Sequence, residues 1–201
     1  MAFPKLLLFD LGGVLLDYTG TRDFLTLLKE PLTPEQIHEK WLGTDVWLQF
    51  ELGRVGQQEF AETVARDWAL TCTAPEFLVH FESWARALFP GASKLLLDLK
   101  PRYRLAALSN SNVTHWRRVE EILGEESVFE RAFSSHQLGL RKPDRAIYEQ
   151  SLQALGASPE ETVFFDDLLE NVEAARAVGM AAHQVRGVDE LRACIVEQGL
   201  L

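Results

Sequence analysis

The apolar run Leu6–Phe9, which ends at Asp10 and is followed by Gly12 and Gly13, most constrains the fold of this chain. Four consecutive apolar residues predict a strand that is buried on both faces, as in a parallel sheet covered by helices. The glycines allow the backbone to turn sharply and to approach a ligand closely. In open α/β sheets the carboxyl ends of the strands face the ligand crevice. Asp10 is therefore a candidate nucleophile or metal ligand, and the alternative is an aspartate that only caps a turn.

From Leu95 onward, strand and helix patterns alternate along the chain. Short apolar strands are predicted at 103–108, 132–135, 162–165 and 181–185, each followed by a helical pattern. Strands that alternate with helices are typical of an α/β fold with a doubly wound parallel sheet. The strand that ends at Asp10 belongs to the same sheet.

Residues 17–90 have a different character, with helical spacing and no clear strand signal. Capping-box patterns at Thr33 to Gln36 and at Thr73 to Glu76 each predict the start of a helix. The segment holds four of the five tryptophans, and we expect its aromatic residues to form its own core. The sequence therefore predicts a helical cap of residues 17–90, inserted into a catalytic core made of residues 1–16 and 91–201.

The overall charge and composition limit the partners of the chain. A net charge of −10 argues against nucleic acid or an anionic membrane as the main partner, because both would be repelled. No apolar run approaches the ~20 residues of a membrane span, and no signal-peptide pattern is present at the N-terminus. Cys72 and Cys194 are far apart and predict free thiols in a reducing compartment. We expect a cytoplasmic protein that acts on a small molecule, and its oligomeric state stays open.

Polar side chains follow the main predicted strands at their carboxyl ends, and Lys142 lies in a loop between two of these strands. The other side chains are Asp10 after the first strand, Ser109 and Asn110 after the second, and Asp166 and Asp167 after the fourth. Because the carboxyl ends of the strands in an open α/β sheet face one ligand crevice, we expect these side chains to meet at one edge of the sheet. One such feature is weak evidence, but the ordered set strongly indicates phosphate chemistry.

These residue types suit a metal-assisted phosphoryl transfer. Mg²⁺ prefers oxygen ligands, which Asp10 and Asp167 could supply together with the backbone carbonyl of Gly12. A carboxylate can attack phosphorus and form an aspartyl phosphate, and a metal with Lys142 would offset the charge repulsion. The Ser109 hydroxyl and backbone N–H groups at the start of the following helix would hold phosphate oxygens.

The four motifs resemble those of the haloacid dehalogenase-like hydrolase superfamily, which has a helical cap inserted after the first strand. They read Phe9-Asp10-Leu11-Gly12-Gly13-Val14, Leu108-Ser109-Asn110, Arg141-Lys142-Pro143 and Phe164-Phe165-Asp166-Asp167. The match covers essentially the whole chain. It is most similar to sugar-phosphate phosphatases of the glucose-1-phosphate type and to the phosphatase domain of bifunctional epoxide hydrolases. The resemblance implies a Rossmann-like core and a Mg²⁺-dependent phosphatase for a small phosphorylated metabolite such as a sugar phosphate.

The resemblance also implies a role for each site residue. Asp10 would be the nucleophile, Ser109, Asn110 and Lys142 would bind phosphate, and Asp166 and Asp167 would serve Mg²⁺. Counting back from Gly179 favours Asp167 as the direct ligand and Asp166 behind it, although neighbouring carboxylates are easily exchanged in such an assignment. No histidine has metal-ligand spacing, and Arg141 is interpreted as an exposed loop residue.

One departure from the family pattern concerns the proton donor. Most phosphatases of the family carry a second aspartate two residues after the nucleophile as general acid and base, and this chain has Gly12 there. Loss of such a group costs ~10²–10⁴-fold on steps that need it. Asp17 or a cap residue could supply the proton, the leaving group could need little protonation, or the chain could be a weak catalyst.

Gly12 therefore keeps two other hypotheses open. A 2-haloacid dehalogenase uses an aspartate nucleophile without a proton donor, but it needs no metal, and Asp166 with Asp167 argues against it. A catalytically silent binding protein is the third hypothesis, and the intact nucleophile, lysine and acidic pair argue against that one.

Overall fold

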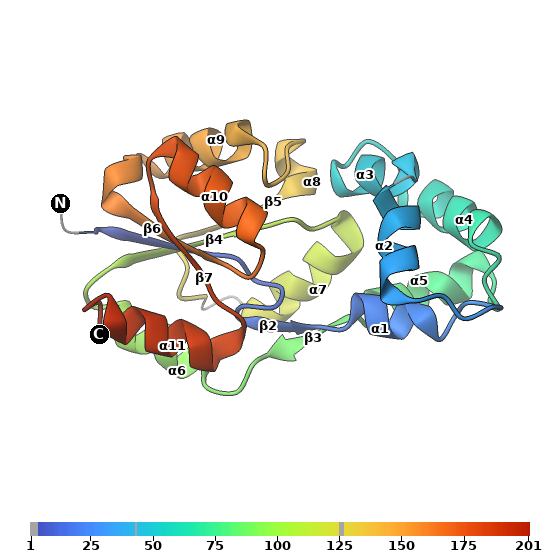
Figure 1. Ribbon diagram of the computed structural model, residues 1–201, viewed down its shortest axis with the longest axis horizontal. Coiled ribbons are helices and arrows are strands. Elements are labelled where there is room, and N and C mark those ends of the chain that lie inside the picture. The colour runs from blue at the N-terminus through green and yellow to red at the C-terminus, as the bar shows by residue number, and fades with distance from the viewer. Residues whose placement is uncertain (1–3, 43, 125–126) are drawn as a thin grey trace.

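A five-stranded parallel sheet forms the centre of the computed structural model, which describes residues 4–42, 44–124 and 127–201 (Figure 1). The strands are β1 (Leu6–Phe9), β4 (Arg104–Ser109), β5 (Arg131–Ser134), β6 (Thr162–Asp166) and β7 (Ala181–Gln184). Their order is β5-β4-β1-β6-β7, and every neighbouring pair is parallel. The chain crosses from one half of the sheet to the other, as a doubly wound sheet requires.

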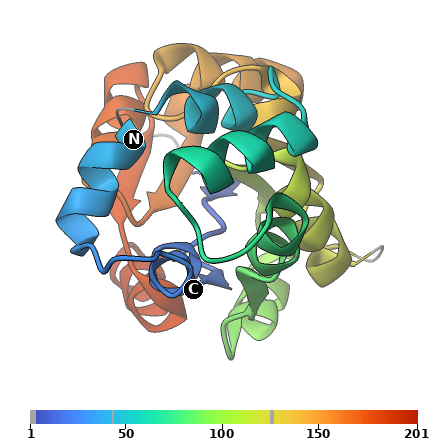
Figure 2. The ribbon, with the colours of Figure 1, turned by 90° about the vertical axis from the view of Figure 1, so that its right-hand side faces the viewer.

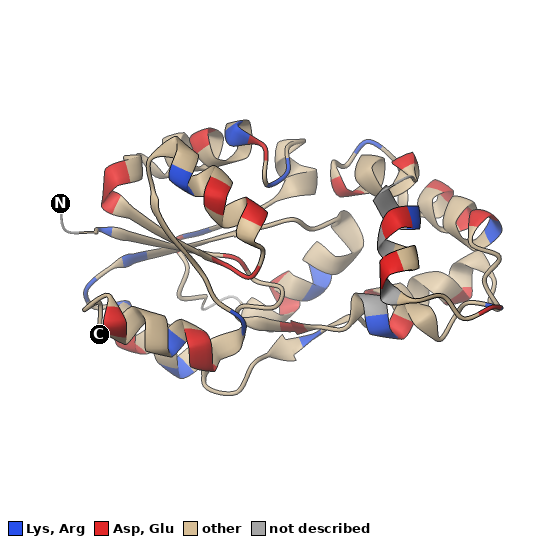
Figure 3. Ribbon diagram, in the orientation of Figure 1, with Lys and Arg blue, Asp and Glu red and all other residues tan. Residues whose placement is uncertain are grey.

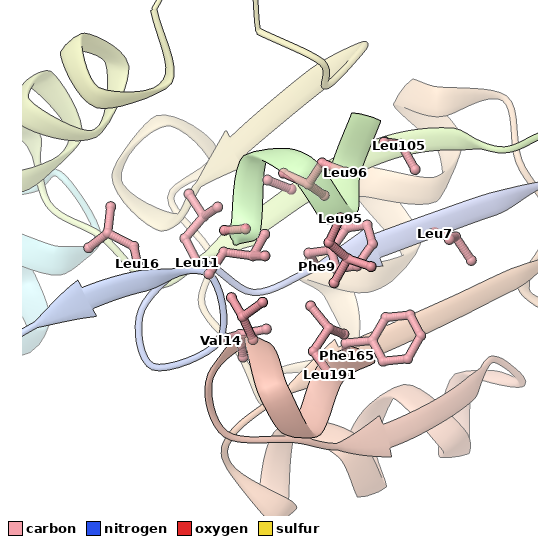
Figure 4. Packing of buried hydrophobic residues seen from close by; sticks show 14 of the residues in the cluster. Leu7, Phe9, Leu11, Val14, Leu16, Leu95, Leu96, Leu105, Phe165 and Leu191 are labelled. Atoms are coloured by element: carbon pink, nitrogen blue, oxygen red, sulfur yellow. The ribbon is translucent and has the colours of Figure 1, made fainter. Parts of the chain in front are cut away.

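Helices cover both faces of this sheet. One face carries α6 (Ala92–Leu99), α7 (Val113–Leu123) and α11 (Gly187–Glu197), and the other carries α9 (Arg145–Leu155) and α10 (Leu169–Val178). Alternate residues of β1 point to opposite faces. Leu7 and Phe9 pack toward α6 and α11 (Figure 4), whereas Leu6 and Leu8 pack toward α9 and α10. The predicted α/β fold is confirmed.

A separate group of helices lies beyond the carboxyl ends of the strands (Figures 1 and 2). These are α1 (Gly20–Leu25), α2 (Pro34–Leu42), α3 (Asp45–Glu51), α4 (Gln57–Asp67) and α5 (Ala74–Glu82). We call them the helical region.

The helical region has its own core, which consists mostly of aromatic rings. Its buried aromatic residues are Phe24, Trp47, Phe50, Phe60, Trp68, Phe77, Phe81 and Trp84. The side chain of Trp41, which the sequence analysis counted with them, lies outside the described part of the structure. The prediction that the aromatic residues form this core is confirmed for the side chains that are described.

The two predicted capping boxes are present. The Thr33 hydroxyl accepts a hydrogen bond from the Gln36 N–H, and the Gln36 side chain accepts one from the Thr33 N–H. Thr73 and Glu76 form the same reciprocal arrangement at the start of α5. These local signals therefore define helix starts independently of the rest of the fold.

Two short strands were not predicted from the sequence. β2 (Leu16–Tyr18) and β3 (Ala85–Leu88) pair antiparallel, with Leu16 opposite Leu88 and Tyr18 opposite Ala85. This ribbon carries the chain out to the helical region and back (Figure 1). Runs of three and four residues are too short to produce a clear alternating pattern.

Charged residues of both signs are interspersed over both parts of the molecule (Figure 3). Among the described residues, the structure has no helix that is both long and apolar enough to cross a bilayer.

Between β5 and α9 lies the short helix α8 (Ser135–Leu138), and the 3-10 helix η1 (Pro159–Glu161) precedes β6. Gly53, just after α3, packs against the backbone of α8 so closely that an added Cβ would lie 2.5 Å from the His136 carbonyl oxygen. The positive φ of Gly53, 70°, also favours glycine. This contact brings the end of α3 against the sheet portion of the molecule.

Candidate active site

The register of the sheet brings the polar strand ends together. Phe9 of β1 pairs with Ala107 of β4 and with Phe165 of β6. Asp10 comes next along the chain, and its N–H donates to the Phe165 carbonyl at 2.8 Å. Asp10 and Asp166 therefore lie at the same level on adjacent strands, at the sheet edge that faces the helical region (Figure 1).

Lys142 lies at the centre of this edge and is only 1% exposed. Its ammonium group donates to Asp10 Oδ1 at 2.7 Å, to Asp166 Oδ2 at 2.6 Å and to the Leu108 carbonyl at 2.9 Å. An ammonium has three protons, so each has an acceptor. Burial lowers the pKa of Lys142, but the two carboxylates outweigh it and leave the pKa above its usual value. Lys142 is therefore charged and fixed.

The Asp10 carboxyl is buried, and its pKa is raised to about 7. Burial is the largest cause, Lys142 opposes it, and the charges of Asp166 and Asp167 add to it. Of the two carboxylate oxygens of Asp10, only Oδ1 has a hydrogen-bond partner among the described residues, and that partner is Lys142. Oδ2 is left as the oxygen that can attack a substrate or bind a cation.

The two neighbouring aspartates after β6 have different surroundings. Asp166 is fully buried and its oxygens accept from Lys142, from the Leu168 N–H at 2.9 Å and from Asn171 at 3.0 Å. Asp167 is half-buried, and apart from its own backbone N–H no described residue donates a hydrogen bond to its carboxylate. The pKa of Asp167 is raised, mainly by burial and secondly by the charge of Asp166. Asp167 is thus the carboxylate of the pair that is free to take a ligand.

Gly13 makes room for this free carboxylate. A Cβ on Gly13 would lie 2.8 Å from Asp167 Oδ2, and the residue has φ 76°. Oxygen atoms of Asp10, Asp166 and Asp167 all lie within 4.8 Å of one another. Three carboxylates at this spacing are ligands of the kind that Mg²⁺ prefers, so the residues present fit the metal that the sequence analysis expected.

The structure brings Ser109 and Asn110 to the site, but in different ways. Ser109 is buried and lines a cavity next to Gly12, and its hydroxyl makes no hydrogen bond to the described residues. The Asn110 amide is instead paired twice with the backbone of Lys142, accepting from its N–H at 2.8 Å and donating to its carbonyl at 2.9 Å. Asn110 therefore positions the lysine, a role that the sequence pattern did not reveal.

The start of α7 is also organised differently from the sequence-based expectation. The Asn112 side chain accepts from the N–H groups of Thr114 and His115, and the Ser111 N–H donates to Ser135. These three N–H groups are therefore already paired within the protein. The expectation that backbone N–H groups of this turn hold phosphate oxygens stays a prediction for the others, beside the Ser109 hydroxyl.

A cavity of about 200 Å³ lies between the sheet edge and the helical region. Gly12 and Ser109 line it from the sheet. Tyr18 lines it from β2, and Glu51 and Phe81 line it from the helical region. The other lining residues are Leu11, Leu16, Trp47, Phe50, Ala85, Asn110, Ser111, Asn112, His115 and Val119.

Asp17 does not line this cavity. Leu16 and Tyr18 do, and Asp17 lies between them on β2. Side chains alternate along a strand, so the Asp17 carboxylate points away from the cavity. Asp17 is therefore poorly placed to supply a proton.

Arg141 differs from its interpretation as an exposed loop residue. Its side chain is one-third exposed, and its Nε lies 3.2 Å from Glu51 Oε1 at the end of α3. The loop that carries Lys142 is thereby connected to the helical region. Sequence patterns could not have found this pair, because its members are 90 positions apart in unrelated segments.

His115 is buried and has a structural position. Its Nε2 lies 2.8 Å from the Phe81 carbonyl and its Nδ1 lies 3.1 Å from the Asn112 amide. The ring packs against Phe81 with centroids 4.0 Å apart. Burial lowers the pKa of His115 to about 4, so the neutral ring connects α7 to α5.

Two phosphatases have sequences that are related to this chain over most of its length. A sesquiterpene phosphatase, astK, from Aspergillus oryzae is 31% identical over 198 residues, which cover 95% of this chain and 93% of that protein. Phosphatase MT3486 from Mycobacterium tuberculosis is 31% identical over 186 residues, with coverage of 88% and 85%.

A solved structure is similar over nearly the whole chain. The HAD family enzyme bt-2542 from Bacteroides thetaiotaomicron, in complex with magnesium and inorganic phosphate, has a TM-score of 0.76 and 26% identity. The match covers 91% of this chain and 94% of that one. The model of the haloacid dehalogenase-like hydrolase family matches residues 4–179. The chain therefore belongs to the haloacid dehalogenase-like hydrolases.

Proposed function

We propose that this hydrolase is a Mg²⁺-dependent phosphatase that removes phosphate from a small monoester through a phospho-aspartate at Asp10. The observation that carries the proposal is the buried cluster in which Lys142 holds Asp10 Oδ1 at 2.7 Å while Asp166 and Asp167 lie beside it. The phosphatase relatives support the reaction class. The finer features below are part of the same proposal.

The metal would be held by Asp10, by Asp167 and by the carbonyl oxygen of Gly12. Asp166 already accepts three hydrogen bonds, which supports a role behind the direct ligands, where it fixes Lys142. The bound cation would neutralise part of the charge on the phosphoryl group. Gly13 serves this arrangement by leaving room for Asp167.

Lys142, Asp10 and Ser109 would have separate roles in the reaction. Lys142 keeps the Asp10 carboxylate oriented and favours its charged form against burial. Asp10 Oδ2 would attack phosphorus, the bond to the leaving oxygen would break, and the Ser109 hydroxyl would hold a phosphate oxygen. Water would then hydrolyse the aspartyl phosphate and regenerate Asp10.

We propose further that residues 17–90 act as the cap and the segments 1–16 and 91–201 as the catalytic core. The independent aromatic core of the helical region and the connection through β2 and β3 support this division. Such a cap would exclude water and select the leaving group. The aromatic lining of Tyr18, Trp47, Phe50 and Phe81 and the volume of about 200 Å³ favour a compact leaving group with an apolar face.

Phosphate release provides the test. Sugar phosphates, prenyl phosphates, acyl phosphates and an aryl phosphate would be assayed with Mg²⁺ and with a chelator, beside Asp10→Asn. We expect release to need Mg²⁺ and to fall by at least ~10⁴-fold in Asp10→Asn, as for loss of a covalent nucleophile. Asp17→Asn is the matched control, because its carboxylate points away from the cavity.

Two results would contradict the proposal: full release by Asp10→Asn, or equal release with chelator. Detection of phosphate on Asp10 by mass spectrometry after acid quenching would support the intermediate directly.

A 2-haloacid dehalogenase is the second candidate, and Gly12 is the observation that favours it. The buried carboxylate cluster opposes it, because that reaction needs no cation. Metal-independent halide release from a 2-haloacid, in the absence of phosphatase activity, would establish it instead.

A further inference from the structure

The cavity wall at Gly12 lacks the acid that most family phosphatases carry there, yet the space for a side chain exists. A Cβ on Gly12 would have Tyr18 Cβ, at 3.9 Å, as its nearest heavy atom. That distance is an ordinary contact. For a leaving oxygen that needs a proton, we look for the donor among the other groups that line the same cavity.

Three lining residues carry a titratable side chain, namely Tyr18, Glu51 and His115. Tyr18 is 43% exposed, and partial burial of its hydroxyl together with the charge of Glu51 raises its pKa above the usual value. Its phenol therefore stays protonated near neutral pH and cannot serve as the base for water attack. Both ring nitrogens of His115 are engaged with Phe81 and Asn112. Glu51 is the remaining group of the three.

Glu51 lines the cavity from the helical region. It is the last residue of α3, and the contact between Gly53 and the α8 backbone brings this end of the helix against the sheet portion. Glu51 Oε1 is buried and makes no hydrogen bond in the described part of the structure, although Arg141 Nε lies 3.2 Å away. The ion pair with Arg141 balances the charge of this carboxyl group, and its unused hydrogen-bonding capacity is available to a ligand in the cavity that Glu51 lines.

The charges around Glu51 suit a group that gains and loses a proton. Burial raises its pKa above the usual value, and the charges of Arg141 and Lys142 limit the increase. The ideal pKa of a general acid lies near the working pH. Arg141 stabilises the carboxylate after the proton has left.

We propose that Glu51 is the general acid and base of this phosphatase, in place of the aspartate absent at Gly12. The inference rests on the proposed function. When Asp10 Oδ2 bonds to phosphorus and the bond to the leaving oxygen breaks, the Glu51 proton moves to that oxygen and an alcohol leaves. The Glu51 carboxylate then takes a proton from the water that attacks the aspartyl phosphate, which releases inorganic phosphate and restores both carboxyl groups.

The dependence on leaving group tests this assignment in the full-length protein. Glu51→Gln keeps the size of the side chain but cannot donate the proton. We expect kcat/KM for an alkyl or sugar phosphate to fall by ~10²–10⁴-fold. For 2,4-dinitrophenyl phosphate, whose leaving group needs no proton, the fall should stay below about 10-fold. Aspartyl phosphate should accumulate in the variant with this aryl substrate, because water attack then lacks its base.

Arg141→Gln is the matched control, because it breaks the same ion pair and keeps the carboxyl group. Glu59→Gln, on the exposed side of α4, controls for loss of one charge in the helical region and should leave turnover unchanged. If Glu51 only joined α3 to the Arg141 loop, Glu51→Gln and Arg141→Gln would give equal losses for both substrate types. That result would overturn the proposal.

A second variant protects the test against misfolding of the first. Gly12→Asp in the Glu51→Gln background should restore at least part of the alkyl phosphate activity, because the Gly12 position has space for a carboxyl group. No rescue, combined with an unchanged ratio of alkyl to aryl rates in Glu51→Gln, would refute the role of Glu51. Failure of the proposed function looks different: the wild-type protein would then release no phosphate from any substrate.

Discussion

The sheet edge and the helical region of this hydrolase are held together by different forces. At the edge, Lys142 is surrounded by Asp10 and Asp166 at hydrogen-bond distance in a buried site. In the helical region, aromatic rings pack on one another, as where Phe50 and Phe60 stack with centroids 4.0 Å apart. Buried charges require a fixed arrangement of partners, because a buried charge without a partner is strongly destabilising. Apolar packing tolerates substitution when volume is conserved.

This difference suits a division between chemistry and selection. The carboxylates and the lysine are positioned by neighbouring strands whose register leaves little freedom. The cavity wall comes partly from the aromatic region, where side chains can change without disturbing the charge cluster. The catalytic edge should thus be intolerant of substitution, and the helical region adaptable.

The largest effect is expected at the centre of the charge cluster. Lys142→Met leaves the Asp10 and Asp166 carboxylates buried without their cation, so we expect a loss of about 3–5 kcal/mol in the free energy of unfolding. Phosphatase activity should disappear as well. Urea unfolding measures the first, and Lys94→Met is the control, because its pair with Asp98 is exposed and should contribute less than about 1 kcal/mol. Equal losses in the two variants would remove the distinction between buried and surface pairs.

The aromatic region should respond to a cavity but not to a surface change. Phe60→Ala removes a fully buried ring and should cost about 3–5 kcal/mol, whereas Val79→Ala, 71% exposed, should stay within about 0.5 kcal/mol. Hydrogen exchange would locate the loss. We expect α4 to lose protection while β1 and β6 keep theirs, and equal loss in β1 would show that the two parts unfold as one.

What the sequence could predict follows the same division. The strand ending at Asp10 and the acidic pair after β6 were recognisable, because each is tied to a local pattern at a strand end. Lys142 lies in a loop and was recognisable through the motif Arg141-Lys142-Pro143. The pairing of Asn110 with the backbone of Lys142 could not be predicted, because the sequence does not show whether an asparagine side chain binds substrate or a neighbouring loop. Glu51 meets Arg141 only through tertiary packing, and no local pattern encodes that contact.

His115 joins the two parts, and its titration should weaken the molecule in acid. Its pKa is about 4 in the folded protein because of burial, against ~6.5 in an unfolded chain. The unfolded state therefore binds more protons between these values, and stability is lost as the pH falls from about 6.5 to 4. The full contribution is about 3 kcal/mol.

The control for this pH effect is His115→Gln, which cannot become charged. We expect the difference in unfolding free energy between wild type and variant to shrink as the pH is lowered through this window. Parallel curves would show that another group causes the acid sensitivity.

The smallest expected effect is the difference between alanine substitutions at two adjacent glycines, Gly12 and Gly13. Gly13→Ala must adopt a φ of 76° and would bring its Cβ within 2.8 Å of Asp167 Oδ2. We expect a loss of about 1–2 kcal/mol in stability from the backbone conformation. The displaced carboxylate should also weaken Mg²⁺ binding by ~10–100-fold, as disturbed support of a ligand does. Gly12→Ala has its nearest contact at 3.9 Å and keeps its carbonyl, so both quantities should stay close to wild type. Titration calorimetry with Mg²⁺ distinguishes the two variants. Equal affinities for Mg²⁺ would mean that Asp167 does not hold the metal. Asp166 would then be the ligand, despite its three hydrogen bonds.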